Sequence, residues 1–243
     1  MSEKAHWDQV WQSKPAEQTS WFQTAPALSG DFITRAGIAK SDPIIDIGSG
    51  ASCLIDWMVA ARYSNITALD IAAGGILKTK KRLGPAGDSL KIIEADIRTW
   101  FAREQFMLWH DRAVFHFLTR EEEQAAYARI LADAVVPGGY FICATFAQDG
   151  PLKCSGLPVQ RYNIQSLKKR FSVNFELLDE SQQTHITPPA EARGGERARR
   201  LLEEEAAALA ASALAAAAPV AASSEMPPPP PRAPPPPPPP PPP

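Results

Sequence analysis

A short apolar run followed at once by two glycines is the feature that most constrains how this chain folds. Residues 44–47 read Ile-Ile-Asp-Ile directly after Pro43, and Gly48 and Gly50 come next. β-branched residues on both faces are typical of a central parallel strand that is buried on both sides. The apolar spacing over residues 51–62 then predicts a helix. A strand, a glycine turn and a helix together bring backbone N–H groups and a helix N-terminus against a ligand.

Strand and helix patterns alternate along most of the chain. Further strands are expected at residues 65–71, 90–95, 106–109, 140–146 and 174–179, with helices at 72–83, 120–135 and 165–170 between or after them. This order predicts an α/β fold with a doubly wound, mostly parallel sheet and helices on both faces. In such sheets the ligand lies outside the carboxyl ends of the strands.

Four acids fall at these carboxyl ends, namely Asp46, Asp70, Asp96 and Asp111. Asp46 interrupts a buried strand, where a carboxylate is unfavourable unless something pairs with it, so we expect it to face the ligand. Asp70 follows Gly50 at the interval at which an acid meets a ribose hydroxyl in nucleotide-binding units. Four like charges repel a phosphate-bearing ligand. They suit S-adenosylmethionine, which has a cationic sulfonium and no phosphate.

An N-terminal helix is predicted from Trp7, Val10 and Trp11, which share one face at i, i+3 and i+4. Trp21 follows in a loop, and a second helix is expected from Pro26 onward. Two roles remain open for the three tryptophans: packing within the core, or a lid over the ligand site.

Composition excludes several other classes of protein. The net charge of −2 gives no basic field for nucleic acid. Three widely spaced cysteines form no disulfide framework and no metal-ligand spacing, so a reduced compartment and no metal are expected. The N-terminus lacks a signal-peptide pattern, and no globular segment has the apolar length of a membrane span. We therefore expect a soluble, cytoplasmic protein with no nucleic-acid or membrane partner.

The composition changes abruptly after Pro188. Residues 1–188 are predicted as one domain, and residues 189–243 as a low-complexity tail, first Ala/Arg-rich and then polyproline. Residues 201–218 contain good helix formers with little apolar face. The proline run can adopt only polyproline II. The tail is expected to be disordered, with a second possibility that it binds a polyproline-recognising domain.

Five motifs in order and at suitable spacing carry a family resemblance. They are Asp46-Ile47-Gly48-Ser49-Gly50, Leu69-Asp70, Ala95-Asp96-Ile97, Asp111-Arg112-Ala113 and Pro137-Gly138-Gly139. On these motifs, residues 7–188 resemble the class I (Rossmann-like) S-adenosylmethionine-dependent methyltransferases. Residues 20–23 and 109–118 are further similar to a subgroup that includes thiopurine-type enzymes and lysine methyltransferases acting on citrate synthase or elongation factors.

The resemblance implies S-adenosyl-L-methionine as cofactor and assigns residues to it. The cofactor-binding residues would be Asp46, Gly48, Ser49, Gly50, Asp70, Ile71, Asp96, Ile97 and Asp111. Gly48 and Gly50 would receive the methionine portion and Asp46 its amino group. Asp70 would bind the ribose hydroxyls, and Asp96 with Ile97 the adenine edge.

The same resemblance implies methyl transfer to a nucleophilic N, O or S of a small molecule or protein side chain. Asp111 lies where the acceptor and the methyl group should meet. For a lysine acceptor, Asp111 or His116 would be the catalytic group that orients the amine and removes its proton. For a carboxylate or thiol acceptor, Arg112 or Arg161 would supply charge instead.

The family pattern also implies a seventh, antiparallel strand near the C-terminus. No β-branched or aromatic run follows residues 184–188, so this strand is expected to be missing or altered. Two other functions stay open. A nucleotide-binding oxidoreductase is disfavoured because the turn has two of the three fingerprint glycines. A non-catalytic interaction protein would act through its polyproline tail.

Overall fold

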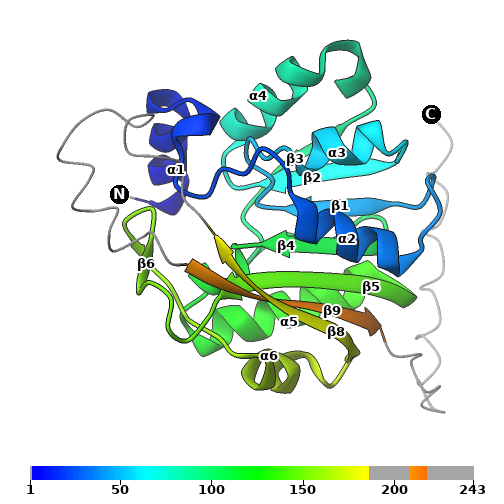
Figure 1. Ribbon diagram of the computed structural model, residues 1–243, viewed down its shortest axis with the longest axis vertical. Coiled ribbons are helices and arrows are strands. Elements are labelled where there is room, and N and C mark those ends of the chain that lie inside the picture. The colour runs from blue at the N-terminus through cyan, green and yellow to red at the C-terminus, as the bar shows by residue number, and fades with distance from the viewer. Residues whose placement is uncertain (1, 186–207, 218–243) are drawn as a thin grey trace, which may run out of the picture.

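The computed structural model of the protein describes residues 2–185 and 208–217. Its centre is a seven-stranded sheet in the order β3-β2-β1-β4-β5-β9-β8 (Figure 1). The strands are β1 (Ile44–Ile47), β2 (Ile66–Asp70), β3 (Lys91–Glu94), β4 (Phe106–Arg112), β5 (Val135–Phe146), β8 (Phe175–His185) and β9 (Ala208–Ala217). Strands β1 to β5 pair in parallel, and β9 runs antiparallel to both β5 and β8. The predicted doubly wound, mostly parallel sheet is confirmed.

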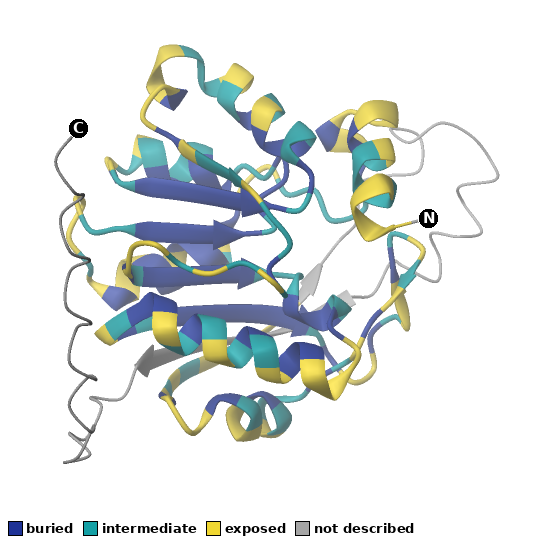
Figure 2. Ribbon diagram, turned by 180° about the vertical axis from the view of Figure 1, so that it is seen from behind, coloured by how far each residue is buried: buried dark blue, intermediate teal, exposed yellow. Residues whose placement is uncertain are grey.

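Helices cover both faces of this sheet, as the two opposite views in Figures 1 and 2 show. One face carries α2 (Ala27–Ala36), α3 (Leu54–Ala60) and α4 (Ala73–Leu83), and the other carries α5 (Glu121–Ala134) and α6 (Ile164–Phe171). The strands between them are largely buried (Figure 2). The first helix, α1 (Glu3–Ser13), packs against α4 and the turn after β1.

Strand residues alternate between two apolar cores. Ile45 of β1 and Trp109 of β4 join the core under α5 and α6, while Ile44 and Leu108 join the core under α2 and α3. Side chains two residues apart point to the same face of a strand. Asp46 and His110 therefore share the α2 face, where they are paired in register.

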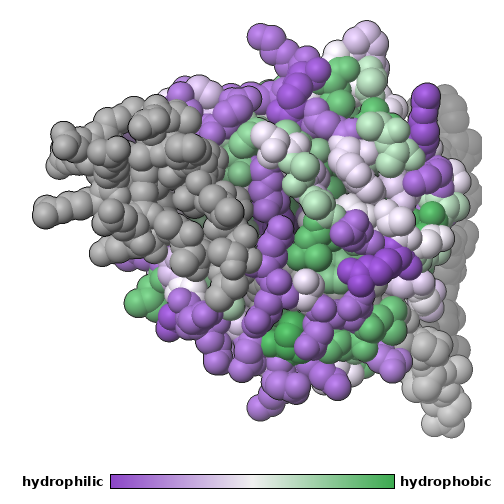
Figure 3. All heavy atoms as spheres, viewed as in Figure 1, coloured by the Kyte–Doolittle hydropathy of each residue, from purple (hydrophilic) through white to green (hydrophobic). Residues whose placement is uncertain are grey.

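Shorter elements complete the described chain. They are the 3-10 helices η1 (Ala16–Gln18), η2 (Gly84–Gly87) and η3 (Phe115–Phe117), and the hairpin of β6 (Lys153–Cys154) and β7 (Leu157–Pro158). Hydrophilic residues spread over the face in Figure 3, with smaller hydrophobic areas among them. Within the residues that the structure describes, no helix has the length and apolar character needed to cross a membrane.

The C-terminal strand decides between the two alternatives expected for the seventh strand, namely that it is missing or that it is altered. Strand β9 occupies its place, between β5 and β8. Its sequence is alanine-rich, so the strand is altered in composition and present in topology. Residues 208–217 were also interpreted as part of a helix-forming stretch, and here they form a strand instead. The predicted tail segments at residues 189–207 and 218–243, including the polyproline run, lie outside the described residues.

Candidate functional site

A cavity opens at the carboxyl ends of the parallel strands, where α1 and the loop after it close over the sheet. Most residues assigned to the cofactor from the sequence line this cavity, namely Asp46, Gly48, Ser49, Gly50, Asp70, Ile71, Asp96 and Ile97. The fold therefore brings residues from three separate segments, at the ends of β1, β2 and β3, to one place. Asp111 and His116 do not line the cavity.

The turn after β1 can form only because two positions carry no side chain. Gly48 and Gly50 have φ values of 62° and 50°, in the left-handed region that favours glycine. A Cβ on Gly48 would lie 2.0 Å from Val114 Cγ2, and a Cβ on Gly50 would lie 2.6 Å from Trp11 Cζ2. The glycines thus let the backbone approach the cavity and let Trp11 cover it.

Asp70 connects this turn to the end of β2. Its carboxylate accepts hydrogen bonds from the Gly50 and Ala72 N–H groups, both at 2.9 Å. Burial raises the pKa of Asp70 to about 6, although these two bonds oppose the rise. Each carboxylate oxygen can accept more than one hydrogen bond. The side chain can therefore hold the turn and still accept a bond from a ligand hydroxyl.

Asp96 lies on the cavity wall in an ion pair with Arg98, whose Nη2 is 2.6 Å from its Oδ2. Burial raises the pKa of Asp96, but the bonds from Arg98 outweigh burial and hold this pKa below its ordinary value. Arg98 also bonds Glu3 of α1 at 3.0 Å and Glu123 of α5 at 3.2 Å. This network fixes the start of α1 beside the predicted adenine site.

Three polar side chains form a continuous chain along the cavity wall. Asp46 Oδ1 lies 2.7 Å from His110 Nδ1, and His110 Nε2 lies 2.9 Å from Ser29 Oγ. All three residues are buried and line the cavity. The arrangement assigns a tautomer in which Nδ1–H donates to Asp46 and the Ser29 hydroxyl donates to Nε2. An imidazole held in this way can take up a proton from the cavity side through Ser29.

Asp111 lies on the opposite side of β4 from the cavity. His110 and Arg112 face the cavity, so the residue between them must point to the other face. Its carboxylate accepts hydrogen bonds from Val114 N at 2.8 Å and from Tyr127 Oη at 2.6 Å. Burial raises the pKa of Asp111 to about 6. In this position the side chain holds the turn after β4, which differs from the expected place beside the acceptor.

His116 is also removed from the cavity. Its ring is fully buried in η3 and makes edge contacts with Phe117 and Phe146. Neither ring nitrogen has a hydrogen-bond partner among the described residues. Burial lowers the pKa of His116 to about 3. The two groups that the sequence offered as catalytic therefore lie behind the wall of the site.

The turn beneath the site gives a stability prediction. Replacing Tyr127 with Phe removes the donor to Asp111 and the acceptor of Trp109 Nε1, at 2.9 Å, in a fully buried position. We expect Tyr127→Phe to lower the free energy of unfolding by about 1–3 kcal/mol, measured by urea denaturation. Tyr162→Phe is the matched control, because the buried Tyr162 hydroxyl has no partner among the described residues. Equal losses for both variants would contradict this account.

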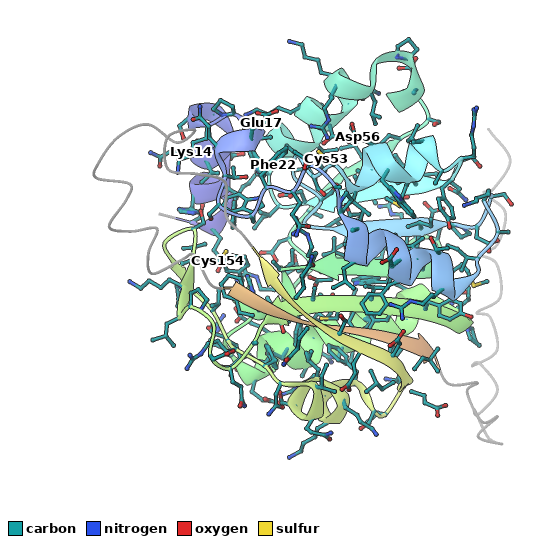
Figure 4. All side chains as sticks on the ribbon, in the orientation of Figure 1. Lys14, Glu17, Phe22, Cys53, Asp56 and Cys154 are labelled. Carbon is teal, nitrogen blue, oxygen red and sulfur yellow. The ribbon has the colours of Figure 1, made fainter. Side chains whose placement is uncertain are left out.

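Aromatic residues of the N-terminal segment form the cover of the cavity. Trp7, Trp11 and Trp21 all line it, and Trp21 meets the other two edge to face, with ring centroids 5.7 and 6.1 Å away. Phe22 and Cys154, labelled in Figure 4, belong to the walls contributed by the N-terminal loop and by β6. The two roles considered for the tryptophans coincide, because the residues that pack on one another also cover the site.

Four buried polar atoms on the cavity wall have no hydrogen-bond partner among the described residues. They are Trp11 Nε1, Asp46 Oδ2, Ser49 Oγ and Thr145 Oγ1. Unpaired buried polar groups are unfavourable, so their grouping indicates a polar ligand. Within the described part of the chain, no group of three or more His, Cys, Asp or Glu side chains is placed to hold a metal ion.

Sequence reasoning missed the roles of His110 and Ser29. Neither residue was assigned to the site from the sequence. The alternation of side chains along a strand could have indicated His110. It lies two residues before Arg112 at the carboxyl end of one strand, so both side chains point to the same face. No signal pointed to Ser29, which reaches the site only through the packing of α2 on the sheet.

Comparisons with known proteins agree with the fold. Residues 44–139 match a family model described as a methyltransferase domain. No curated protein matches the chain.

Several solved structures have the same fold, and three of them illustrate it. One comes from work on conversion of a disulfide bond into a thioacetal group during echinomycin biosynthesis (16% identity, TM-score 0.67, covering 90% of this chain and 95% of that one). Another is an S-adenosylmethionine-dependent methyltransferase from Anabaena variabilis (12%, 0.64, 89% and 96%). The third is the 1,6-didemethyltoxoflavin-N1-methyltransferase of Burkholderia thailandensis with bound S-adenosylhomocysteine (14%, 0.59, 86% and 81%).

The matched segment begins at β1 and ends inside β5, so it contains the glycine turn and every strand between β1 and β4. Residues 44–139 therefore match a methyltransferase domain, and the described chain has the Rossmann-like fold of solved S-adenosylmethionine-dependent methyltransferases.

Proposed function

We propose that this enzyme transfers a methyl group from S-adenosylmethionine to a nucleophilic nitrogen, oxygen or sulfur of an acceptor bound in the same cavity. The observation that carries the proposal is the chain Asp46–His110–Ser29, which lies on the cavity wall beside the glycine turn. It offers a proton acceptor next to the cofactor site, which a purely binding protein does not need.

The cavity residues fit the cofactor chemically. Gly48, Ser49 and Gly50 would hold the methionine portion, and the free Oδ2 of Asp46 would accept from its ammonium group. Asp70 and Ile71 would meet the ribose. Asp96 and Ile97 would meet the adenine edge, with Arg98 fixing the carboxylate. S-adenosylmethionine supplies an electrophilic methyl group on a sulfonium.

The chain's own residues then have two tasks. The aromatic cover excludes water and positions the acceptor for an in-line displacement. As the acceptor's N–H, O–H or S–H loses its proton, that proton passes to Ser29 Oγ, and the Ser29 proton passes to His110 Nε2. Asp46 then faces an imidazolium through Nδ1–H, and its carboxylate stabilises the positive charge. Asp111 and His116 take no part in this sequence.

The acceptor class is narrowed by the walls of the cavity. Trp21, Phe22, Phe117 and Phe146 line it and favour a flat or apolar body. Methylation at nitrogen is supported by the B. thailandensis neighbour, which by its name acts at N1 of 1,6-didemethyltoxoflavin. We propose the thiopurine-type and lysine methyltransferases as the nearest functional subgroup, on the resemblance of residues 20–23 and 109–118.

A binding experiment tests the cofactor assignment. S-adenosylhomocysteine is expected to raise the melting midpoint, because a ligand specific for the folded state stabilises it by about 2.7 kcal/mol at a hundredfold excess over Kd. NAD is expected to leave the midpoint unchanged. Binding of NAD alone in isothermal titration would instead favour the oxidoreductase.

Transfer of a labelled methyl group identifies the class of acceptor. Tritium from methyl-labelled S-adenosylmethionine is followed into the protein and small-molecule fractions of a lysate of the source organism. Label in the protein fraction favours a side-chain acceptor, and label in the small-molecule fraction favours the thiopurine-type alternative. S-adenosylhomocysteine binding without labelling in either fraction would support a non-catalytic interaction protein.

A further inference from the structure

Arg112 carries a positive charge into the cavity wall without an acidic partner. Its Nη1 donates to Gln23 Oε1 at 3.0 Å, and its Nη2 donates to the Trp21 carbonyl at 3.2 Å. Both acceptors are neutral. Among the side chains that the structure describes, none is a carboxylate within ion-pair distance of Arg112.

Other partly buried arginines of the protein are arranged differently. Arg82 pairs with Asp56, Arg98 with Asp96, and Arg170 with Glu121, each at 2.6 Å. Burial is unfavourable for a guanidinium and lowers the pKa of Arg112, an effect that the negative charge of Asp46 opposes. Arg112 therefore differs from these three arginines, each of which forms an ion pair with a carboxylate.

Arg112 lines the cavity. A guanidinium has five N–H groups, and the two contacts above leave the others for a ligand. Its planar fork matches a carboxylate in two parallel bonds. Asp46, whose buried Oδ2 has no hydrogen-bond partner among the described residues, lines the same wall and would repel a doubly charged phosphate more than a carboxylate.

We infer that Arg112 binds a ligand carboxylate in the cavity, an inference that rests on the methyltransferase function proposed above. Arg112 and Asp46 together provide one cationic and one anionic group on a single wall. A carboxylate can come from the methionine portion of the cofactor or from an anionic acceptor. The chemistry is the same in both cases, and ligand pairs that differ only in the carboxylate separate them.

The first arm of the test uses the cofactor product. Isothermal titration compares S-adenosylhomocysteine with its decarboxylated analogue, S-adenosyl-3-thiopropylamine, on the wild-type chain and on Arg112→Met. If the cofactor supplies the carboxylate, the wild type prefers S-adenosylhomocysteine by about tenfold or more, as for a charged hydrogen bond. The variant then binds both ligands equally. Arg112→Lys keeps the positive charge but cannot form two parallel hydrogen bonds to a carboxylate, so it should retain part of the preference for S-adenosylhomocysteine.

The second arm uses acceptor-like probes on protein with and without S-adenosylhomocysteine. Benzoate and indole-3-acetate are compared with their amides, by quenching of the cavity tryptophans. If the acceptor supplies the carboxylate, the wild type prefers each acid by about tenfold and Arg112→Met loses the preference. Arg129→Met is the matched control, because Arg129 is an exposed arginine on α5 outside the cavity.

Two results overturn the inference: no carboxylate preference of the wild type in either arm, or a preference that persists in Arg112→Met. Failure of the proposed methyltransferase function gives a different result. The wild type would then bind neither S-adenosylhomocysteine nor its decarboxylated analogue, while the acceptor-like probes of the second arm would still test carboxylate binding by Arg112. The melting midpoint of ligand-free Arg112→Met shows whether loss of the contacts to Trp21 and Gln23 has unfolded the N-terminal segment.

Discussion

His110→Gln is expected to lower the turnover of methyl transfer by about 10²-fold or more, the usual contribution of a positioned general base. Glutamine can still donate a hydrogen bond toward Asp46, which His110 meets at 2.7 Å. It cannot accept and hold a proton as an imidazolium. The change should therefore fall on kcat, with a small effect on the Kd of S-adenosylhomocysteine. The initial rate of tritium transfer at saturating cofactor measures this loss.

Ser29→Ala separates a proton path from a structural contact. It removes the hydroxyl that bonds His110 Nε2 at 2.9 Å but leaves the Asp46–His110 pair intact. A smaller loss of turnover than in His110→Gln fits a path in which Ser29 only passes the proton. Unchanged turnover in both variants would remove the Asp46–His110–Ser29 chain from the mechanism.

The sequence-based choice of base makes the opposite prediction. If His116 removes the proton, His116→Phe should abolish turnover while His110→Gln has little effect. The structure favours the reverse, because the His116 ring is buried among Phe117 and Phe146 and does not line the cavity. Phenylalanine also suits that apolar environment, where both ring nitrogens lack partners among the described residues. The pair of variants therefore decides between the two histidines.

Local patterns were sufficient for strands β1 to β5 and β8, and for most of the cavity residues that are expected to bind the cofactor. The run at residues 44–47 and its two glycines led to β1 and the left-handed turn after it. Acids at strand ends then located Asp46, Asp70 and Asp96, because the carboxyl ends of parallel strands meet at one edge. These signals depend on a few neighbouring residues, so they can be recognised without the rest of the fold.

These local patterns did not show to which face of the sheet each strand side chain points. Asp111 was placed in the site because it follows a strand, but adjacent strand residues point to opposite faces. The face is decided by pairing, and Asp46 stands opposite His110 in the register between β1 and β4. The Asp111 carboxylate lies beneath the site, where it accepts hydrogen bonds from the Tyr127 hydroxyl and from the backbone N–H of Val114.

The C-terminal strand could not be predicted because its residues have the wrong intrinsic preference. Alanine favours helices and is depleted in strands. In the structure β9 pairs along its whole length with β8 and over seven positions with β5. Strand preference is strongly dependent on context, and two ready neighbours satisfy the backbone groups of an otherwise poor strand former. The open edges of β5 and β8 thus determine the structure of residues 208–217 more than the intrinsic helix preference of alanine does.

Ending the chain after His185 is expected to abolish cooperative folding. The ten-residue strand β9 is bonded on both sides, and its loss leaves β5 and β8 with unpaired edges inside the sheet. At about 1 kcal/mol net for each hydrogen bond, the loss is comparable to the whole stability of a domain, about 5–15 kcal/mol. Circular dichroism during thermal denaturation should show no sharp transition, and size-exclusion chromatography should show aggregates.

A chain ending after Ala217 is the matched control, because it keeps every described strand and should unfold at the wild-type midpoint. Ala213→Pro tests the same point with one residue, since position 213 pairs with Cys143 of β5 and with Glu180 of β8. Proline cannot donate to a ladder and is confined to the edges of sheets. We expect a lower midpoint for this variant. If the chain ending after His185 melts like the wild type and still binds S-adenosylhomocysteine, then β9 is dispensable, and the domain of residues 1–188 is complete without it.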